Sequence, residues 1–247
     1  MDRPGPGRRD RPFLMLSIQR VAVSLDNKVI LHDTTLTVAD EEIVAVIGPS
    51  GSGKSTLLRA VAGLVPVDSG DIQWDGASVV DVPVHQRGFG LMFQGFALFP
   101  HLDVARNVGF GLRMTGAPPE QVRTEVSAAL DWVGLAGFES RSIDDLSGGE
   151  RQRVALARTL APQPKLVMPD EPMGSLDRHL RERLVVETRD LLTERSVTAL
   201  VVTHDREEAE LLSDRLALMR EGTIIQTGTL DEILASPVDE WVTEFLG

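Results

Sequence analysis

A glycine-rich segment that joins a short apolar run to a helical stretch limits what this chain can fold into more than any other feature. The apolar run, residues 43–47, has the continuity of a parallel strand that is covered on both faces. The segment after it fits the pattern G-x-x-x-x-G-K-[ST] and consists of Gly48, Pro49, Ser50, Gly51, Ser52, Gly53, Lys54, Ser55 and Thr56. This order of strand, loop and helix predicts an α/β fold built around a phosphate-binding loop.

Each residue type in this loop has a chemical use. Glycines let backbone N–H groups curl around phosphate oxygens, and the following helix adds its positive end. Lys54 is expected to reach the β- and γ-phosphates, and the Ser55 hydroxyl is expected to bind Mg²⁺. The loop predicts nucleotide binding but does not indicate to which class of nucleotide-binding protein the chain belongs.

Apolar patterns place further strands around the loop. Residues 14–38 alternate apolar and polar around Asp26-Asn27, which predicts a hairpin of half-buried antiparallel strands. Two continuous apolar runs, 166–168 and 198–202, predict buried strands that are followed by acidic residues or a histidine. Since ligands of open parallel sheets collect at the carboxyl ends of the strands, these ends predict a functional site.

Helical patterns fill the remaining segments. Residues from about 95 to 160 are mostly helical and irregular and are interrupted by prolines, which predicts a helical subdomain nested in the sheet domain. A helix over 206–213, a hairpin that turns at Glu221-Gly222 and a last helix from Thr229 are expected to follow. One nested unit is the simplest organisation.

Charge and composition exclude several classes of function. The chain has 25 Lys plus Arg against 37 Asp plus Glu, a net charge of −12, so a nucleic-acid partner is disfavoured. It has no cysteine, which excludes disulfides and thiolate metal sites. No apolar run approaches the roughly 18 residues that a membrane span needs. Residues 1–14 lack a packing pattern and are predicted to be a disordered tail ahead of residues 15–247.

A second glycine-containing element opens a helix that is predicted to run to about Leu160. Ser147 and Glu150 have the spacing of a capping box, which by itself indicates only a well-made helix start. Gly148 and Gly149 stand just inside that helix, where each glycine costs up to about 0.8–1.0 kcal/mol relative to alanine. Bare backbone at this place suits the close approach of an anion.

Together with the phosphate loop, the segment LSGGERQRVALARTL resembles the signature of ATP-binding cassette proteins. The resemblance covers residues 15–247 and implies a P-loop NTPase (RecA-like) mixed sheet with an N-terminal antiparallel β subdomain and an inserted α-helical subdomain. It also implies ATP and Mg²⁺ as cofactors and a head-to-tail dimer with a second copy of the chain. In that dimer Ser147, Gly148, Gly149 and Glu150 would bind the ATP held by the other copy's phosphate loop.

Other positions match motifs of the same family. Asp170-Glu171 resembles the Walker B element, in which Asp170 suits the Mg²⁺ shell and Glu171 can act as general base toward the attacking water. Gln94 matches the Q-loop glutamine, which senses Mg²⁺ and water, and His204 matches the switch histidine that contacts the γ-phosphate. The resemblance thus implies Glu171, His204 and Gln94 as catalytic residues and Ser55, Gln94 and Asp170 as metal ligands. It places Asp177 in the D-loop that reaches the other copy's site.

Two positions depart from the family pattern. Pro169 precedes Asp170 where an aliphatic residue is usual; it either marks the last strand position or shifts Asp170 and slows turnover. Leu25 stands where an aromatic residue normally stacks on adenine, and the lost stack would cost about 0.5–1.5 kcal/mol. Neither departure removes a catalytic group, so an active ATPase is still expected.

The segment FQGFALFPHLDVARNVGFGLR resembles most the subunits that energise import of ferric iron, thiamine, polyamines or sulfate, in a short form without a C-terminal regulatory domain. This implies transmembrane permease subunits and a solute-binding protein as partners, and a place on the cytoplasmic face of the cell membrane. Phe96, Leu98, Phe99 and Pro100 would line the groove for the permease, or simply belong to the core. An exporter subunit and a non-transport cassette that acts on ribosomes or DNA are the alternatives; the single phosphate loop and the acidic charge disfavour the latter.

Overall fold

The computed structural model describes residues 14–174 and 178–247, whose strands form an antiparallel and a mostly parallel sheet. The antiparallel sheet has the order β2-β1-β4-β5 and comprises β1 (Leu14–Leu25), β2 (Lys28–Ala39), β4 (Ser69–Trp74) and β5 (Ala77–Ser78). The turn between β1 and β2 contains Asp26 and Asn27, which have φ of 49° and 61°. A type I′ turn needs positive φ at both positions, and Asp and Asn tolerate it. The predicted hairpin is confirmed.

The second sheet has the order β10-β9-β3-β8-β7-β6. Its strands are β3 (Ile43–Ile47), β6 (Phe89–Met92), β7 (Leu166–Pro169), β8 (Ala199–Thr203), β9 (Arg215–Arg220) and β10 (Thr223–Gly228). All neighbouring pairs are parallel except β9 and β10, which turn at Glu221-Gly222 as predicted. Every residue of β3, β7 and β8 is buried, which explains why these strands are continuously apolar in the sequence. Their carboxyl ends lie along one edge of the sheet.

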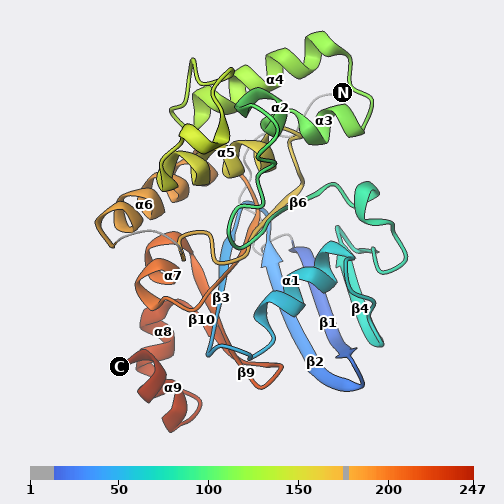
Figure 1. Ribbon diagram of the computed structural model, residues 1–247. Coiled ribbons are helices and arrows are strands. Elements are labelled where there is room, and N and C mark those ends of the chain that lie inside the picture. Colours follow the sequence, from blue (N-terminus) through green and yellow to red (C-terminus); the bar gives the residue numbers. More distant parts are fainter. Residues whose placement is uncertain (1–13, 175–177) are drawn as a thin grey trace, which may run out of the picture.

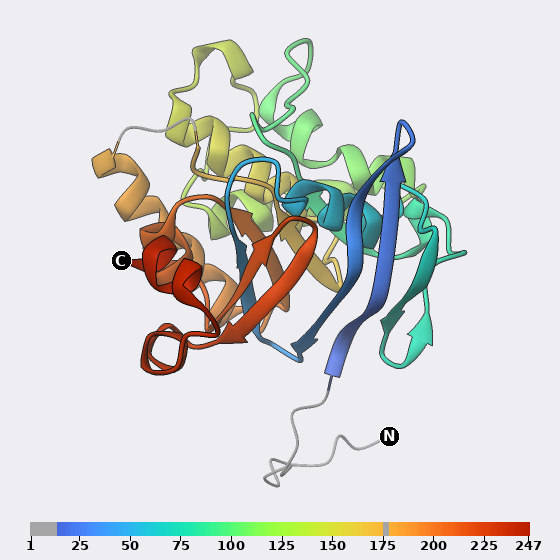
Figure 2. The same cartoon turned by 90° about the horizontal axis from the view of Figure 1, so that it is seen from below.

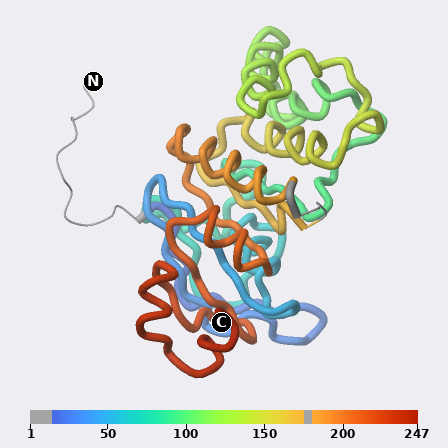
Figure 3. Tube along the Cα trace, turned by 90° about the vertical axis from the view of Figure 1, so that its left-hand side faces the viewer, coloured from blue at the N-terminus to red at the C-terminus, as the bar shows by residue number. Residues whose placement is uncertain are grey.

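Helices cover both sheets and form a separate group at one end of the molecule (Figures 1 and 3). They are α1 (Lys54–Ala62), α2 (Val104–Val108), α3 (Phe110–Met114), α4 (Pro119–Trp132), α5 (Gly148–Leu160), α6 (Arg178–Glu194), α7 (Arg206–Leu212), α8 (Leu230–Ala235) and α9 (Glu240–Leu246). The group at one end consists of α2 to α5. Within the described ranges no helix is long and apolar enough to cross a bilayer.

The C-terminal segment differs from the single helix expected there. Thr229 caps α8 together with Glu232, so the predicted start is confirmed. That helix ends at Ala235, and α9 begins after Asp239, which caps it. Pro237 lies between them and cannot continue a helix because it has no N–H to donate.

Strand β3 is buried because its two faces pack against different parts of the chain. Val44 and Val46 belong to an apolar cluster with α1 and the antiparallel sheet. Ala45 and Ile47 point to the other face, where they pack with residues of α7, β9, α8 and α9. Helix α1 therefore lies between the two sheets (Figures 1 and 2), and its N-terminus is held at the carboxyl end of β3.

Arg87 binds the C-terminal end of α1. Its buried guanidinium donates to the carbonyls of Ala60 and Val61 in the last turn of the helix, at 3.2 and 2.7 Å. It also donates to Val80 and Val82 at 2.9 Å each. Burial lowers the pKa of Arg87, but a guanidinium stays charged and so satisfies four carbonyls, while no carboxylate in the described part of the chain pairs with it.

Replacing this residue tests the role of the guanidinium fork. Arg87→Lys keeps the charge but offers a point donor that cannot reach carbonyls in several directions, so buried acceptors lose their partners. We expect the free energy of unfolding to fall by about 2–3 kcal/mol in urea denaturation followed by circular dichroism. Arg123→Lys, at an exposed ion pair with Glu120, is the matched control and should change it by less than about 0.5 kcal/mol. Equal effects of the two substitutions would contradict this role.

Candidate functional site

The glycine-rich loop leaves β3 and wraps the start of α1, as its sequence predicts. Gly48 lies so close to β9 that a Cβ atom there would come within 2.0 Å of the carbonyl oxygen of Met219. Gly53 is the residue before α1 and has φ of 104°, which side chains rarely allow. The backbone of the loop therefore depends on glycine at these two positions.

Lys54 is buried and bends back onto its own loop. Its Nζ donates to the carbonyl oxygens of Gly48 and Pro49 at 2.8 and 2.9 Å. Burial lowers the pKa of Lys54, while the carboxylates of Glu171 and Asp170 oppose that shift. An anion that enters the loop would offer the ammonium group a better partner than two neutral carbonyls.

Ser55 and Asp170 join the start of α1 to the end of β7. The Ser55 hydroxyl donates to Oδ1 of Asp170 at 2.9 Å. Asp170 is 4% exposed; burial raises its pKa, and the bond from Ser55 and the charge of Arg59 oppose that rise. Both groups are hard oxygen ligands of the kind that Mg²⁺ prefers, and that ion usually takes only one or two protein carboxylates beside phosphate oxygens and water. The pair fits Mg²⁺ bound together with a nucleotide.

Pro169 is the last residue of β7, directly before this carboxylate. It pairs with Met92 of β6 and lacks the N–H that a strand residue would donate. The two residues after it restore the ladder, because Asp170 N–H donates to Met92 and Glu171 N–H to Val202, both at 2.8 Å. The geometry fits the first of the two expectations, that the proline marks the strand's end.

Three side chains from the ends of neighbouring strands meet in front of the loop. Glu171 follows β7, Gln94 follows β6 and His204 follows β8. Gln94 Nε2 donates to Oε2 of Glu171 at 2.7 Å, and His204 Nδ1 lies 3.1 Å from Oε1. Glu171 has φ of 48°, an uncommon conformation for a residue with a side chain. Both oxygens of its carboxylate thus have partners.

A hollow of about 570 Å³ opens over this arrangement. It contains most of the residues predicted from the loop together with the three side chains, and its lining consists of Lys28, Ile30, Ser50, Gly51, Gly53, Lys54, Ser55, Thr56, Gln94, Glu171 and His204. Leu25, predicted at the adenine position, is packed against the core of the antiparallel sheet. Leu25 is not among the residues that line the hollow, whereas Lys28 and Ile30 on β2 are. Their two-residue spacing on one strand face was the available clue, but the sequence does not show which face meets the loop.

The predicted second phosphate element lies elsewhere in the same chain. Ser147 and Glu150 form the capping box of α5, and the hydrogen bonds from the Ser147 side chain and backbone lower the pKa of Glu150. These residues line a separate hollow of about 400 Å³ with Gly149 and Arg183. Gly149 also has a packing reason, since a Cβ atom there would lie 3.1 Å from Leu180 of α6. Gly148 begins the helix, and Asp177 lies outside the described residues.

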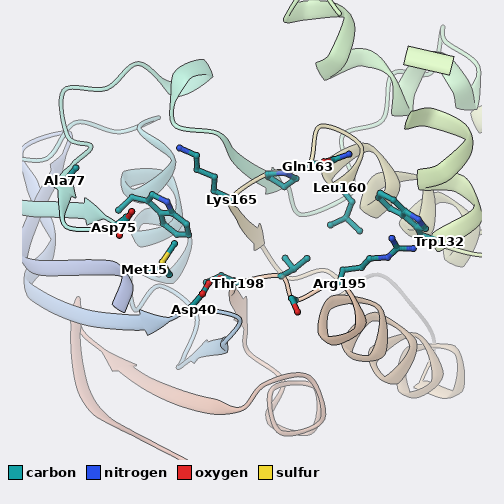
Figure 4. A pocket seen from close by; sticks show the side chains of 14 residues that line it. Met15, Asp40, Asp75, Ala77, Trp132, Leu160, Gln163, Lys165, Arg195 and Thr198 are labelled. Atoms are coloured by element: carbon teal, nitrogen blue, oxygen red, sulfur yellow. The ribbon is translucent and has the colours of Figure 1, made fainter. Parts of the chain in front are cut away.

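A larger hollow of about 800 Å³ lies at the opposite edge of the sheet (Figure 4). It is lined by residues that precede β7 and β8, such as Lys165 and Thr198, and by Trp132 at the end of α4. None of the predicted site residues is among its lining. The functional edge of the sheet is therefore identified by its polar side chains and not by the volume of the hollow, because these side chains gather at the carboxyl ends of the strands.

Comparison with known proteins agrees with this geometry. The model of the family described as "ABC transporter" matches residues 31–174, which include the loop, Gln94, the α5 element and Glu171. The Fe(3+) ions import ATP-binding protein FbpC of Streptomyces avermitilis is 54% identical over 234 residues, which are 95% of this chain and 68% of that protein.

Two further matches extend the comparison. The spermidine/putrescine import ATP-binding protein PotA of Mesoplasma florum is 42% identical over 94% of this chain and 67% of its own length. The solved dimeric structure of MJ0796, a bacterial ABC transporter cassette, superposes with a TM-score of 0.76 at 30% identity, over 87% of this chain and 99% of that one. The fold, the loop and these relatives lead to one conclusion: this chain belongs to the ABC transporter family, as an ATP-binding and ATP-hydrolysing subunit.

Proposed function

We propose that this subunit powers solute import, with Glu171 as the general base of ATP hydrolysis. The observation that carries this proposal is the carboxylate of Glu171, which lies between Gln94 and His204 in front of a phosphate loop. A carboxylate in that place can accept the proton of a water that attacks the terminal phosphate.

The backbone and the lysine of the glycine-rich loop would bind the phosphates of the nucleotide. Backbone N–H groups of residues 50–54 and the N-terminus of α1 take the phosphates. Before ATP binds, the ammonium group of Lys54 is paired with the carbonyls of Gly48 and Pro49. When ATP binds, Lys54 would exchange these bonds for bonds to phosphate oxygens. Ser55 and Asp170 would hold Mg²⁺, with Gln94 nearby, and the ion would neutralise charge on the phosphates.

The contacts of Glu171 would change when ATP binds. One oxygen accepts from Gln94 and the other contacts His204, and each oxygen keeps a second lone pair that can accept from an attacking water. The terminal phosphate of ATP is a further charged acceptor for His204, whose side chain is half exposed. Binding of ATP would draw His204 toward the phosphate and make the carboxylate of Glu171 more accessible to the water.

The active form that we propose contains two copies head to tail. In one copy Ser147, Gly149 and Glu150 line a hollow separate from that of the phosphate loop, so they cannot complete the copy's own site there. The α5 N-terminus of one copy would meet the ATP of the other, together with Gly148 and Asp177. The dimeric form of the similar cassette MJ0796 supports this arrangement.

Import of ferric iron is the transport activity that the comparisons favour, since the relative at 54% identity is named for Fe(3+) import. The partners would be transmembrane permease subunits at the cytoplasmic face of the membrane and a solute-binding protein. Spermidine and putrescine, named for the relative at 42% identity, are the competing solutes.

Glu171→Gln tests the general base. The amide cannot accept a proton, so kcat for ATP should fall about 10²- to 10⁴-fold, while ATP binding is retained. Phosphate release gives kcat, and light scattering at saturating ATP should show a dimer. Glu194→Gln, an exposed residue at the end of α6, is the control and should leave both readouts unchanged. Wild-type turnover in the Glu171 variant, or a monomer with ATP bound, would contradict the proposal.

Asp170→Asn tests the metal ligands. The neutral amide is a weaker ligand, so the Mg²⁺ concentration for half-maximal turnover should rise at least about tenfold. Ser55→Ala should act in the same direction, and Ser55→Thr, which keeps the hydroxyl, should not. Chelation with EDTA should abolish turnover, and added Mg²⁺ should restore it. An unchanged Mg²⁺ dependence in both the Asp170→Asn and Ser55→Ala variants would exclude these residues as ligands.

Uptake by cells that carry the complete transporter tests the solute. Uptake of radioactive Fe³⁺ should require the wild-type chain and should stop in the Glu171→Gln variant. Uptake of labelled spermidine in the same cells should be equal for both. The reverse pattern would assign the transporter to polyamines, and outward movement of either solute would make it an exporter.

A further inference from the structure

The side chain of Thr203 holds the turn that carries His204. Thr203, the last residue of β8, is 1% exposed, and its hydroxyl oxygen accepts the N–H of Asp205 at 3.0 Å. The same hydroxyl donates to Oε2 of Glu208 at 2.8 Å. His204 lies in the chain between Thr203 and Asp205, so the position of its backbone depends on these two residues.

Glu208 is an unusual residue to find in this place. It lies on α7 and is 3% exposed, and its other oxygen, Oε1, is buried and has no hydrogen-bond partner among the residues that the structure describes. A neutral residue would be the more stable choice in such surroundings, because a buried charge without full compensation is costly. A group retained at this cost is a candidate for function.

A second helix, α6, also contacts the turn that carries His204. Asp205 caps α7 by accepting the N–H of Glu208 at 3.1 Å, and its other oxygen pairs with Arg181 at 2.8 Å. Arg181 is on α6, which packs beside α7 (Figure 1). The residues on both sides of His204 are thus held, Thr203 by Glu208 of α7 and Asp205 by Arg181 of α6.

We propose that Glu208, in its ionised form, is a positioning residue that holds His204 at the terminal phosphate of ATP. The carboxylate makes the Thr203 hydroxyl donate to it, and this leaves the hydroxyl oxygen free to accept from Asp205. A bond to a charged acceptor is about twice as strong as one to a neutral acceptor. Protonated Glu208 would loosen the turn and let His204 leave its place.

The charge state of Glu208 changes in the neutral range. Burial raises its pKa to about 7, with Asp205 acting in the same direction and Thr203, Arg181 and His204 against it. The strands that pack against α7 face it with apolar side chains and Thr203. Since the folded pKa is above the unfolded value of 4.5, the stability that Glu208 contributes is complete below about pH 4.5 and is lost as the pH rises through 7.

Glu208→Gln separates positioning from stability. The amide keeps the shape and removes the charge, so kcat at pH 8 should fall about tenfold with an ATP dissociation constant within twofold of wild type. The melting temperature at pH 8.5 should not fall and is expected to rise, with a smaller difference at pH 5. Turnover of the wild-type chain between pH 5.5 and 8.5 should show an acid limb near pH 7 that the variant lacks.

Three controls accompany this variant. Glu210→Gln changes an exposed carboxylate on the same helix and should match wild type in every readout. Thr203→Val removes the hydroxyl and should reproduce the loss of turnover, and Thr203→Ser should restore it. An unchanged kcat at pH 8 in Glu208→Gln, a loss that follows a lowered melting temperature, or an acid limb that persists would overturn the proposal.

This inference rests on the proposed role of His204, and His204→Ala separates the two. If that variant loses turnover while Glu208→Gln does not, only the positioning role fails. If His204→Ala turns over like wild type, the proposed role of His204 fails first.

Discussion

Main-chain hydrogen bonds between parallel strands keep the carboxyl ends of β6, β7 and β8 level with one another, and the site depends on that register. Asp170 and Glu171 lie past the end of β7, yet their N–H groups still donate to Met92 on one side and Val202 on the other. The three side chains at the ends of these strands therefore meet within hydrogen-bond distance. Helix α1 completes the arrangement because it starts at the same edge, where Ser55 bonds to Asp170.

Local patterns were sufficient to predict much of this structure. The hairpin around Asp26-Asn27 and the buried strand before Gly48 follow from residue types that are adjacent in the sequence. The carboxyl-end rule then brought Glu171 and His204 to the loop, since parallel strands can deliver side chains only to one edge. The family resemblance added Gln94, which composition alone would not have singled out.

The features that escaped prediction depend on contacts between distant segments. In the sequence Arg87 cannot be told from an ordinary surface arginine, because the four carbonyls that it binds are brought around it only by the fold. Glu208 reads as an exposed helix residue, because a seven-residue helix gives little periodicity from which to choose its buried face. The lining of the hollow by Lys28 and Ile30 could not be predicted either, since the face of a twisted strand that meets the loop is fixed only by packing. The effect of Pro169 on the strand depends on the hydrogen bonds of Asp170 and Glu171, which the sequence does not show.

The order of the chain has a consequence for the helices α2 to α5. Strands β6 and β7 are parallel neighbours, so the chain must return from the carboxyl end of one to the amino end of the other. A tight turn can join only antiparallel strands, and parallel neighbours need a crossover connection. All of α2 to α5 lies between Met92 and Leu166, and these helices are that crossover. They cannot be excised like an appended module, because the carboxyl end of β6 would then have no chain connection to the amino end of β7.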